Sequence, residues 1–221
     1  MKLLTDGASN PKTAKSAGFG YLTGILHLAP HTQSGYQVCP SATEGCSTAC
    51  LYFQGRGRMN TVQEARIRKT RMFFENRAGF MADLEKDIAS IVRRADKNNL
   101  KPCVRLNGTS DLRWERTGIM EKFPNVIFYD YTKITNRKRL PKNYSLTFSR
   151  SEKTTHDEWC KAIDDGMNVA VVFRDAIPEG WLGVPVIDGT THDLRFLDPK
   201  PCIVGLTAKG SAKKDTSGFV V

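Results

Sequence analysis

The chain has 221 residues, of which 40% are hydrophobic, enough for one sizeable core, and this argues against global disorder. Its 33 Lys and Arg outnumber 23 Asp and Glu, and the formal charge of +10 favours polyanionic partners such as nucleic acid, nucleotides or phosphate-rich substrates. The sequence lacks an apolar run of the ~20 residues that a membrane helix needs, and the apolar patch near its start is too short for a signal peptide. We therefore expect a cytoplasmic protein with reduced thiols and no membrane partner.

The N-terminal part of the chain is expected to run from an arm into a strand, a loop and a helical region. Residues 1–18 are polar and are expected to form a flexible arm. The stretch 20–30 has the composition of a strand and stops at a proline. A cysteine-rich loop follows at 38–58. In the helical region 60–99, apolar residues recur at helical spacing, and Gly79 is expected to separate two helices.

Beyond residue 100, short apolar runs alternate with helical segments. This alternation indicates parallel βαβ units, and runs such as VAVVF and CIVGL are typical of parallel strands covered on both faces. We expect a single α/β domain over 19–221, built as an incomplete parallel (β/α) barrel of about six or seven strands, with an open doubly wound parallel sheet as the alternative. The expected strands lie at 102–111, 125–133, 144–152, 167–175, 184–193 and 202–210, with helices at 112–123 and 154–166.

Polar side chains recur where these strands end. In either architecture the carboxyl ends of parallel strands carry the active site. A single polar residue there is more often a turn or cap residue, but its recurrence on successive strands favours a binding site. We expect a small-molecule substrate to be held there by charge-assisted hydrogen bonds from Asn107, Asp111, Lys133, Arg150 and Asp193.

Three of the six cysteines, Cys39, Cys46 and Cys50, share one loop with the spacing C-x6-C-x3-C. Structural zinc usually takes four ligands and shows close C-x2-C pairs, which are absent here. Three loop thiolates suit a [4Fe-4S] cluster, and one iron then stays open for a substrate, solvent or a distant ligand such as His31 or His192. Zinc, and thiols that only pack or react, are the alternatives. The other three cysteines are expected to be buried packing residues: Cys103, Cys160 and Cys202.

Arginines follow the cysteine loop closely. Together with nearby aromatic residues they would grip a nucleic-acid backbone and stack bases, whereas the simpler interpretation is a solvated helix face. The arginines assigned to nucleic-acid binding are Arg56, Arg58, Arg66 and Arg68.

Several motifs resemble the bacteriophage family called gene product 88, over most of the chain from about residue 20 onward. They are CPSATEGCSTACLYFQGRGR, VRLNGTSDLRWE, FYDYTK and VIDGTTHDLRFLDP with IVGLTAKG. The resemblance implies a viral origin and action in the host cytoplasm, but it implies little about chemistry.

A more distant resemblance is to radical S-adenosylmethionine enzymes, which place three cysteines after the first strand of a partial parallel barrel. By that analogy Cys39, Cys46 and Cys50 hold a four-iron cluster, and S-adenosylmethionine is the cosubstrate. That superfamily spaces its cysteines C-x3-C-x2-C, and its second strand often ends in Gly-Gly-Glu where this chain has NGTSD. The analogy therefore supports the cluster better than the cosubstrate. Two functions stay open: an enzyme with an open iron, or a nucleic-acid-binding protein whose cluster or zinc is structural.

Overall fold

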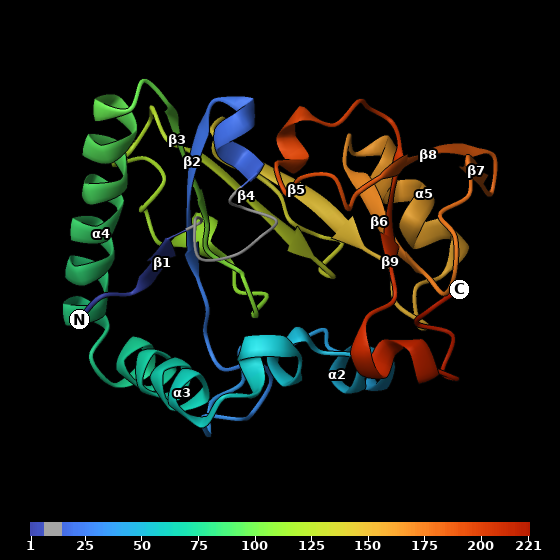
Figure 1. Ribbon diagram of the computed structural model, residues 1–221, viewed down its shortest axis with the longest axis horizontal. Coiled ribbons are helices and arrows are strands. Elements are labelled where there is room, and N and C mark those ends of the chain that lie inside the picture. The colour runs from blue at the N-terminus through green and yellow to red at the C-terminus, as the bar shows by residue number, and fades with distance from the viewer. Residues whose placement is uncertain (7–14) are drawn as a thin grey trace.

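Nine strands form one mostly parallel sheet in the computed structural model, which describes residues 1–6 and 15–221 (Figure 1). The strand order across the sheet is β1-β2-β3-β4-β5-β6-β9-β8-β7. In this order, each pair of adjacent strands from β2 to β8 is parallel. The edge strands β1 and β7 are antiparallel to β2 and β8. The strands are β1 Leu4–Asp6, β2 Tyr21–Leu26, β3 Lys101–Arg105, β4 Ile127–Thr132, β5 Tyr144–Ser149, β6 Asn168–Phe173, β7 Gly180–Trp181, β8 Val184–Asp188 and β9 Ile203–Thr207.

Four α-helices and several 3-10 turns surround the sheet in the described part of the chain. The α-helices are α2 Glu44–Thr48, α3 Asn60–Glu75, α4 Arg77–Lys97 and α5 His156–Asp164. The 3-10 turns are η2 Lys15–Phe19, η3 Leu51–Phe53, η4 Gly55–Arg58, η5 Trp114–Arg116, η6 Arg195–Leu197 and η7 Gly210–Lys214. In Figure 1, α4 stands beside the β1–β3 side of the sheet, and α2 lies below the sheet near the red C-terminal turn. The predicted mixed α/β architecture is confirmed.

The main core lies between the helices and one face of the sheet. Side chains alternate along parallel strands, so Val104 and Phe128 join the apolar faces of α4 and α5 in one buried cluster. Their neighbours Cys103 and Tyr129 point to the other face, where they pack with Leu194 just before η6. Helices α3, α4 and α5 thus contribute to the core of one face, and smaller apolar clusters cover the second face.

The structure differs from the predicted elements at the arm and at the helix break. Leu4–Asp6 form edge strand β1, and the backbone N–H groups of Leu3 and Leu4 both donate to Asp87, so this part of the expected flexible arm is anchored. Residues 15–18 of the expected arm belong to η2, in which Ser16 is buried, and residues 7–14 lie outside the described residues. The break between α3 and α4 falls at Asn76, whose side chain caps α4 by accepting a hydrogen bond from the Gly79 N–H at 3.0 Å.

Two further differences concern the second half of the chain. The helix expected at 112–123 is reduced to the short turn η5, because hydrogen bonds to the Asn107 side chain hold the segment in a loop. In the sheet, β9 lies between β6 and β8, so the last two parallel strands exchange places relative to chain order. None of the described helices is long and apolar enough to cross a membrane.

Candidate metal centre

Three cysteines of the loop after β2 line one cavity at the carboxyl ends of the parallel strands. Cys39 precedes α2, Cys46 lies within it, and Cys50 follows it. The cavity measures about 370 Å³, within the roughly 300–1,000 Å³ of small-molecule pockets. All three thiols are free and partly buried. The sulfur atoms expected to act as ligands therefore share one cavity.

Short-range hydrogen bonds hold the loop in this shape. Thr43 caps α2, and its hydroxyl accepts from the Cys46 N–H at 3.3 Å while donating to Glu152 at 2.7 Å. The second carboxylate oxygen of Glu152 accepts from the Gly45 N–H at 2.8 Å. A Cβ on Gly45 would lie 2.3 Å from the Ser217 hydroxyl oxygen, so only glycine fits between the loop and the C-terminal segment. Glu152 and the C-terminal segment thus clamp the cysteine loop from two sides.

The thiols lie in an environment that disfavours three uncompensated negative charges. Burial, with smaller contributions from the nearby Cys50 and Cys46 thiols, raises the pKa of Cys39 to about 12. Burial also raises the pKa of Cys50. Backbone N–H groups oppose this effect: that of His31 donates to the Cys39 sulfur at 3.4 Å, and that of Tyr52 donates to the Cys50 sulfur. Three thiolates in this cavity would require a cationic centre to hold them together.

Four of the five expected substrate-binding residues line the same cavity: Asn107, Asp111, Lys133 and Asp193. Asn107 and Asp111 follow β3, Lys133 follows β4 and Asp193 follows β8, so all four lie beyond the carboxyl ends of parallel strands. The side-chain oxygen of Asn107 accepts hydrogen bonds from Ser110, the Leu112 N–H and the Trp114 indole, at 2.9–3.0 Å. Its amide group donates to the Leu112 carbonyl at 2.9 Å. Asn107 therefore shapes the cavity wall by organising its own loop.

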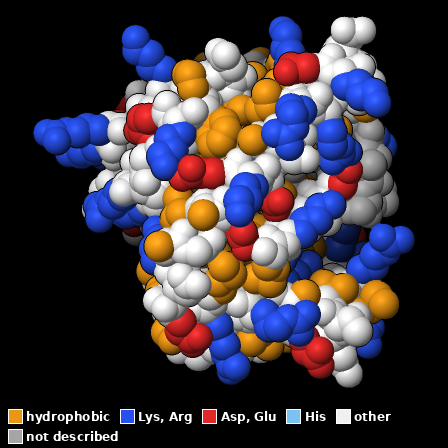
Figure 2. All heavy atoms as spheres, turned by 90° about the vertical axis from the view of Figure 1, so that its left-hand side faces the viewer, with side chains coloured by type: hydrophobic (Ala, Val, Ile, Leu, Met, Phe, Trp, Pro, Cys, Tyr) orange, Lys and Arg blue, Asp and Glu red, His pale blue; other side chains and the backbone are white. Residues whose placement is uncertain are grey.

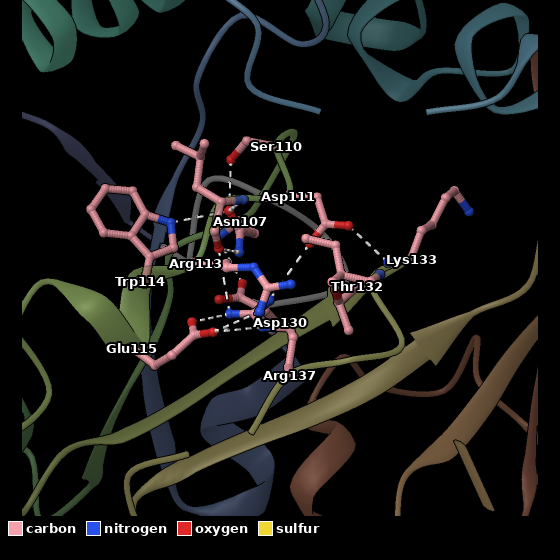
Figure 3. Close-up of polar contacts among 12 residues, drawn as sticks. Asn107, Ser110, Asp111, Arg113, Trp114, Glu115, Asp130, Thr132, Lys133 and Arg137 are labelled. Atoms are coloured by element: carbon pink, nitrogen blue, oxygen red, sulfur yellow. Dashed lines mark hydrogen bonds and ion pairs between the residues drawn. The ribbon is translucent and has the colours of Figure 1, made fainter. Parts of the chain in front are cut away.

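A buried network of charges continues from this loop (Figure 3). Asp111 accepts from the Lys133 backbone N–H at 2.8 Å and lies 3.6 Å from the Arg137 guanidinium, which also pairs with Glu115. The Lys133 side chain points away from this network. Its ammonium donates to the Ser149 hydroxyl at 2.9 Å, and burial lowers its pKa, while the Cys46 thiol lies near enough to favour its charge. Lys133 thus places a positive charge beside a candidate ligand.

Two functional candidates were absent from the sequence-based prediction. Arg105 lines the cavity, pairs with Asp193 at 3.0 Å and stacks on the Tyr131 ring at 4.8 Å. Arg105 is the last residue of β3, and a charged residue at the carboxyl end of an apolar strand was the signal available in the sequence. Glu152 follows β5, and its position after the end of a strand was the only feature of the sequence that pointed to a role at the site.

The sequence profile of the family described as gene product 88 matches residues 2–221. The chain belongs to the gene product 88 family. No curated protein and no solved structure shows a significant match to it.

In this gene product 88 protein, Arg150 is turned away from the cavity wall. Its guanidinium donates to the carbonyls of Gly218 and Phe219, at 2.8 and 3.4 Å, and stacks on the Trp181 ring at 5.8 Å. Arg150 does not appear among the cavity-lining residues, in contrast to the other four. Its side chain anchors the C-terminal segment.

The arginines after the cysteine loop divide into two groups. Arg56, Arg58 and Arg68 are exposed, whereas Arg66 is partly buried and stacks on the Tyr52 ring at 5.5 Å. On the face formed by α4, Lys and Arg side chains are scattered among acidic and hydrophobic ones (Figure 2). Arg66 therefore faces the interior of this family member. Of the four arginines expected to bind nucleic acid, only Arg56, Arg58 and Arg68 are exposed.

Neither predicted distant ligand lines the cavity. The His31 ring lies 3.1 Å from the Thr32 hydroxyl, and the His192 ring nitrogen accepts from the Leu194 N–H at 3.2 Å. Within the described residues, no group of three or more His, Cys, Asp and Glu side chains is arranged to hold a metal ion. As they stand, the three thiols of the gene product 88 loop do not converge on a single ion.

Proposed function

We propose that this chain binds a [4Fe-4S] cluster through Cys39, Cys46 and Cys50. The observation that carries the proposal is that three unpaired, partly buried thiols from one loop line a single cavity at the carboxyl ends of the parallel strands. These residues are of the chemical type that such a cluster needs, because thiolates are its usual ligands. Backbone N–H groups also donate to two of the three sulfur atoms.

A cluster accounts for this arrangement better than zinc does. A tetrahedral zinc site needs four ligand atoms converging on one ion, and no such group is found among the described residues. A four-iron cluster instead bonds each cysteine to a different iron, so its ligand sulfurs lie farther apart than those of a mononuclear site. Zinc remains the second candidate for the same three thiols.

The cavity supports an enzyme that acts on a small molecule, with S-adenosylmethionine as one candidate. When bound, the cluster would supply electrons and an open iron. The chain would supply the binding groups: the Arg105–Asp193 pair and the exposed Lys209 line the cavity together with Asp111. The nearly sequential strand order, with α4 and α5 in the core of one face, also fits an incomplete barrel. The proposed place of action is the host cytoplasm.

Nucleic-acid binding, with a structural cluster, is the alternative function. The exposed side chains of Arg56, Arg58 and Arg68 and the charge of +10 favour it. Phosphate contacts would make such binding fall steeply as salt concentration rises. Binding to DNA or RNA that persists at high salt would contradict this alternative.

Cysteine substitution tests the ligand assignment. Alanine at Cys39, Cys46 or Cys50 is expected to abolish or greatly lower the iron content of protein purified without oxygen. Alanine at Cys103 in β3 or at Cys202 just before β9, which are both buried thiols away from the loop, should leave iron bound. Iron content that falls equally in both groups would contradict the assignment. The proposed enzyme activity is tested separately, by adding S-adenosylmethionine to the reduced protein and measuring its cleavage products.

A further inference from the structure

Arg66 is a positive charge turned toward the cysteine loop. It lies on α3, and its guanidinium stacks on the Tyr52 ring at 5.5 Å. Its Nη1 atom is buried and has no hydrogen-bond acceptor among the described residues. Arg68, two residues along the same helix, is exposed and lies 3.8 Å from Glu64. The two side chains differ in environment although they share a helix.

The described residues leave the Arg66 charge without a carboxylate partner. No ion pair to Arg66 exists among them, and the nearby Lys69 is a like charge, which together with Arg66 and Arg105 disfavours a proton on His27. The groups near Arg66 that can become negative are Cys50 and Tyr52. A partly buried cation without a counter-charge carries a desolvation cost, and a negative charge near Cys50 would offset this cost.

We infer that Arg66 is the counter-charge of the centre held by Cys39, Cys46 and Cys50 and raises its reduction potential. This inference rests on the proposed function. A [4Fe-4S] core of charge +2 with three thiolates carries −1, and uptake of one electron brings it to −2 without a proton. A neighbouring cation stabilises the reduced form more than the oxidised form, because its attraction grows with the opposing charge. Arg66 is thus a positioning and tuning residue and need not touch substrate.

The test compares Arg66→Gln, Arg66→Lys and the control Arg68→Gln, all reconstituted with iron and sulfide without oxygen. The midpoint potential is measured by electrode titration with mediators and followed by the absorbance and electron paramagnetic resonance of the cluster. Arg66→Gln should shift the potential to a more negative value than wild type. Arg66→Lys should shift it less, and Arg68→Gln should match wild type.

The outcomes of these measurements either support or contradict the role of Arg66. If Arg66→Gln loses iron while Arg66→Lys keeps it, the charge is needed to hold the centre, which supports the inference. A potential equal to wild type in Arg66→Gln would overturn it, as would an equal shift of potential, or an equal loss of iron, in the Gln and Lys variants. A wild-type protein that takes up no cluster would refute the proposed function itself, before any variant is compared.

Discussion

Among single residues, Glu152 holds the cysteine loop most directly. Its carboxylate accepts hydrogen bonds from the Thr43 hydroxyl and the Gly45 N–H, so it joins the segment after β5 to the start of α2. Such charge-assisted bonds are stronger than neutral ones. Glu152 therefore acts on the proposed centre through the geometry of the loop that carries Cys46.

Replacement of Glu152 by glutamine is expected to lower the free energy of unfolding by about 1.5–3 kcal/mol, the usual scale for hydrogen bonds to a charged group. Urea unfolding of the metal-free protein measures this change. The matched control is Glu44→Gln, since Glu44 lies in the same helix and is exposed. Equal stability of the two variants would show that Glu152 is not a clamp.

The same residue gives a pH dependence. Burial raises the pKa of Glu152, but hydrogen bonds from Gly45 and Thr43 outweigh it and hold the pKa below the ordinary value of 4.5. A carboxyl group whose pKa is lower in the folded state stabilises the fold above its unfolded pKa and loses this effect as pH falls. The stability difference between wild type and Glu152→Gln should be constant above about pH 6 and shrink below pH 4.5. Unfolding curves over that range check it, and a difference independent of pH would contradict it.

At the scale of elements, the C-terminal segment covers the cysteine loop. Phe219 lines the cavity, and the Ser211 hydroxyl donates to the Thr48 carbonyl at 2.9 Å. Arg174 adds hydrogen bonds to the carbonyls of Lys213 and Asp215. The end of the chain and the loop after β2 therefore form one wall from two distant parts of the sequence.

Arg150→Ala is expected to loosen this wall, because the Arg150 guanidinium binds two carbonyls of the segment. The free energy of unfolding should fall by about 1–3 kcal/mol. Carboxypeptidase should also remove C-terminal residues faster than in wild type. Lys153→Ala, at an exposed position three residues away, is the control and should behave like wild type. Unchanged stability and digestion in Arg150→Ala would contradict an anchoring role.

Elements with strong local patterns could be predicted, and those that depend on tertiary contacts could not. Buried parallel strands such as β6 can be predicted because each is a continuous apolar run in the sequence. The strands β1 and β7 have three and two residues, too few to show alternation. The helix expected at 112–123 fails because Asn107, outside that segment, captures the Leu112 N–H and the Trp114 indole. Sequence periodicity does not contain that contact.

For the whole molecule, chain order predicted most of the sheet and the edge that bears the site. Strands β2 to β6 are neighbours in sequence order, so residues at their ends meet, as Asp111 and Lys133 do. The exchange of β8 and β9 depends on long-range pairing, and the inward turn of Arg66 depends on packing against Tyr52. Residue type predicted which groups carry charge, but side-chain direction decided whether each faces solvent or the cavity.

The metal content of wild-type protein, purified without oxygen, tests the central claim most directly. Iron, acid-labile sulfide and zinc are measured per chain, together with the absorption spectrum. The account predicts four irons and four sulfides per chain and a brown protein that bleaches on reduction. A colourless protein with one zinc per chain, or with no metal after reconstitution, would contradict it.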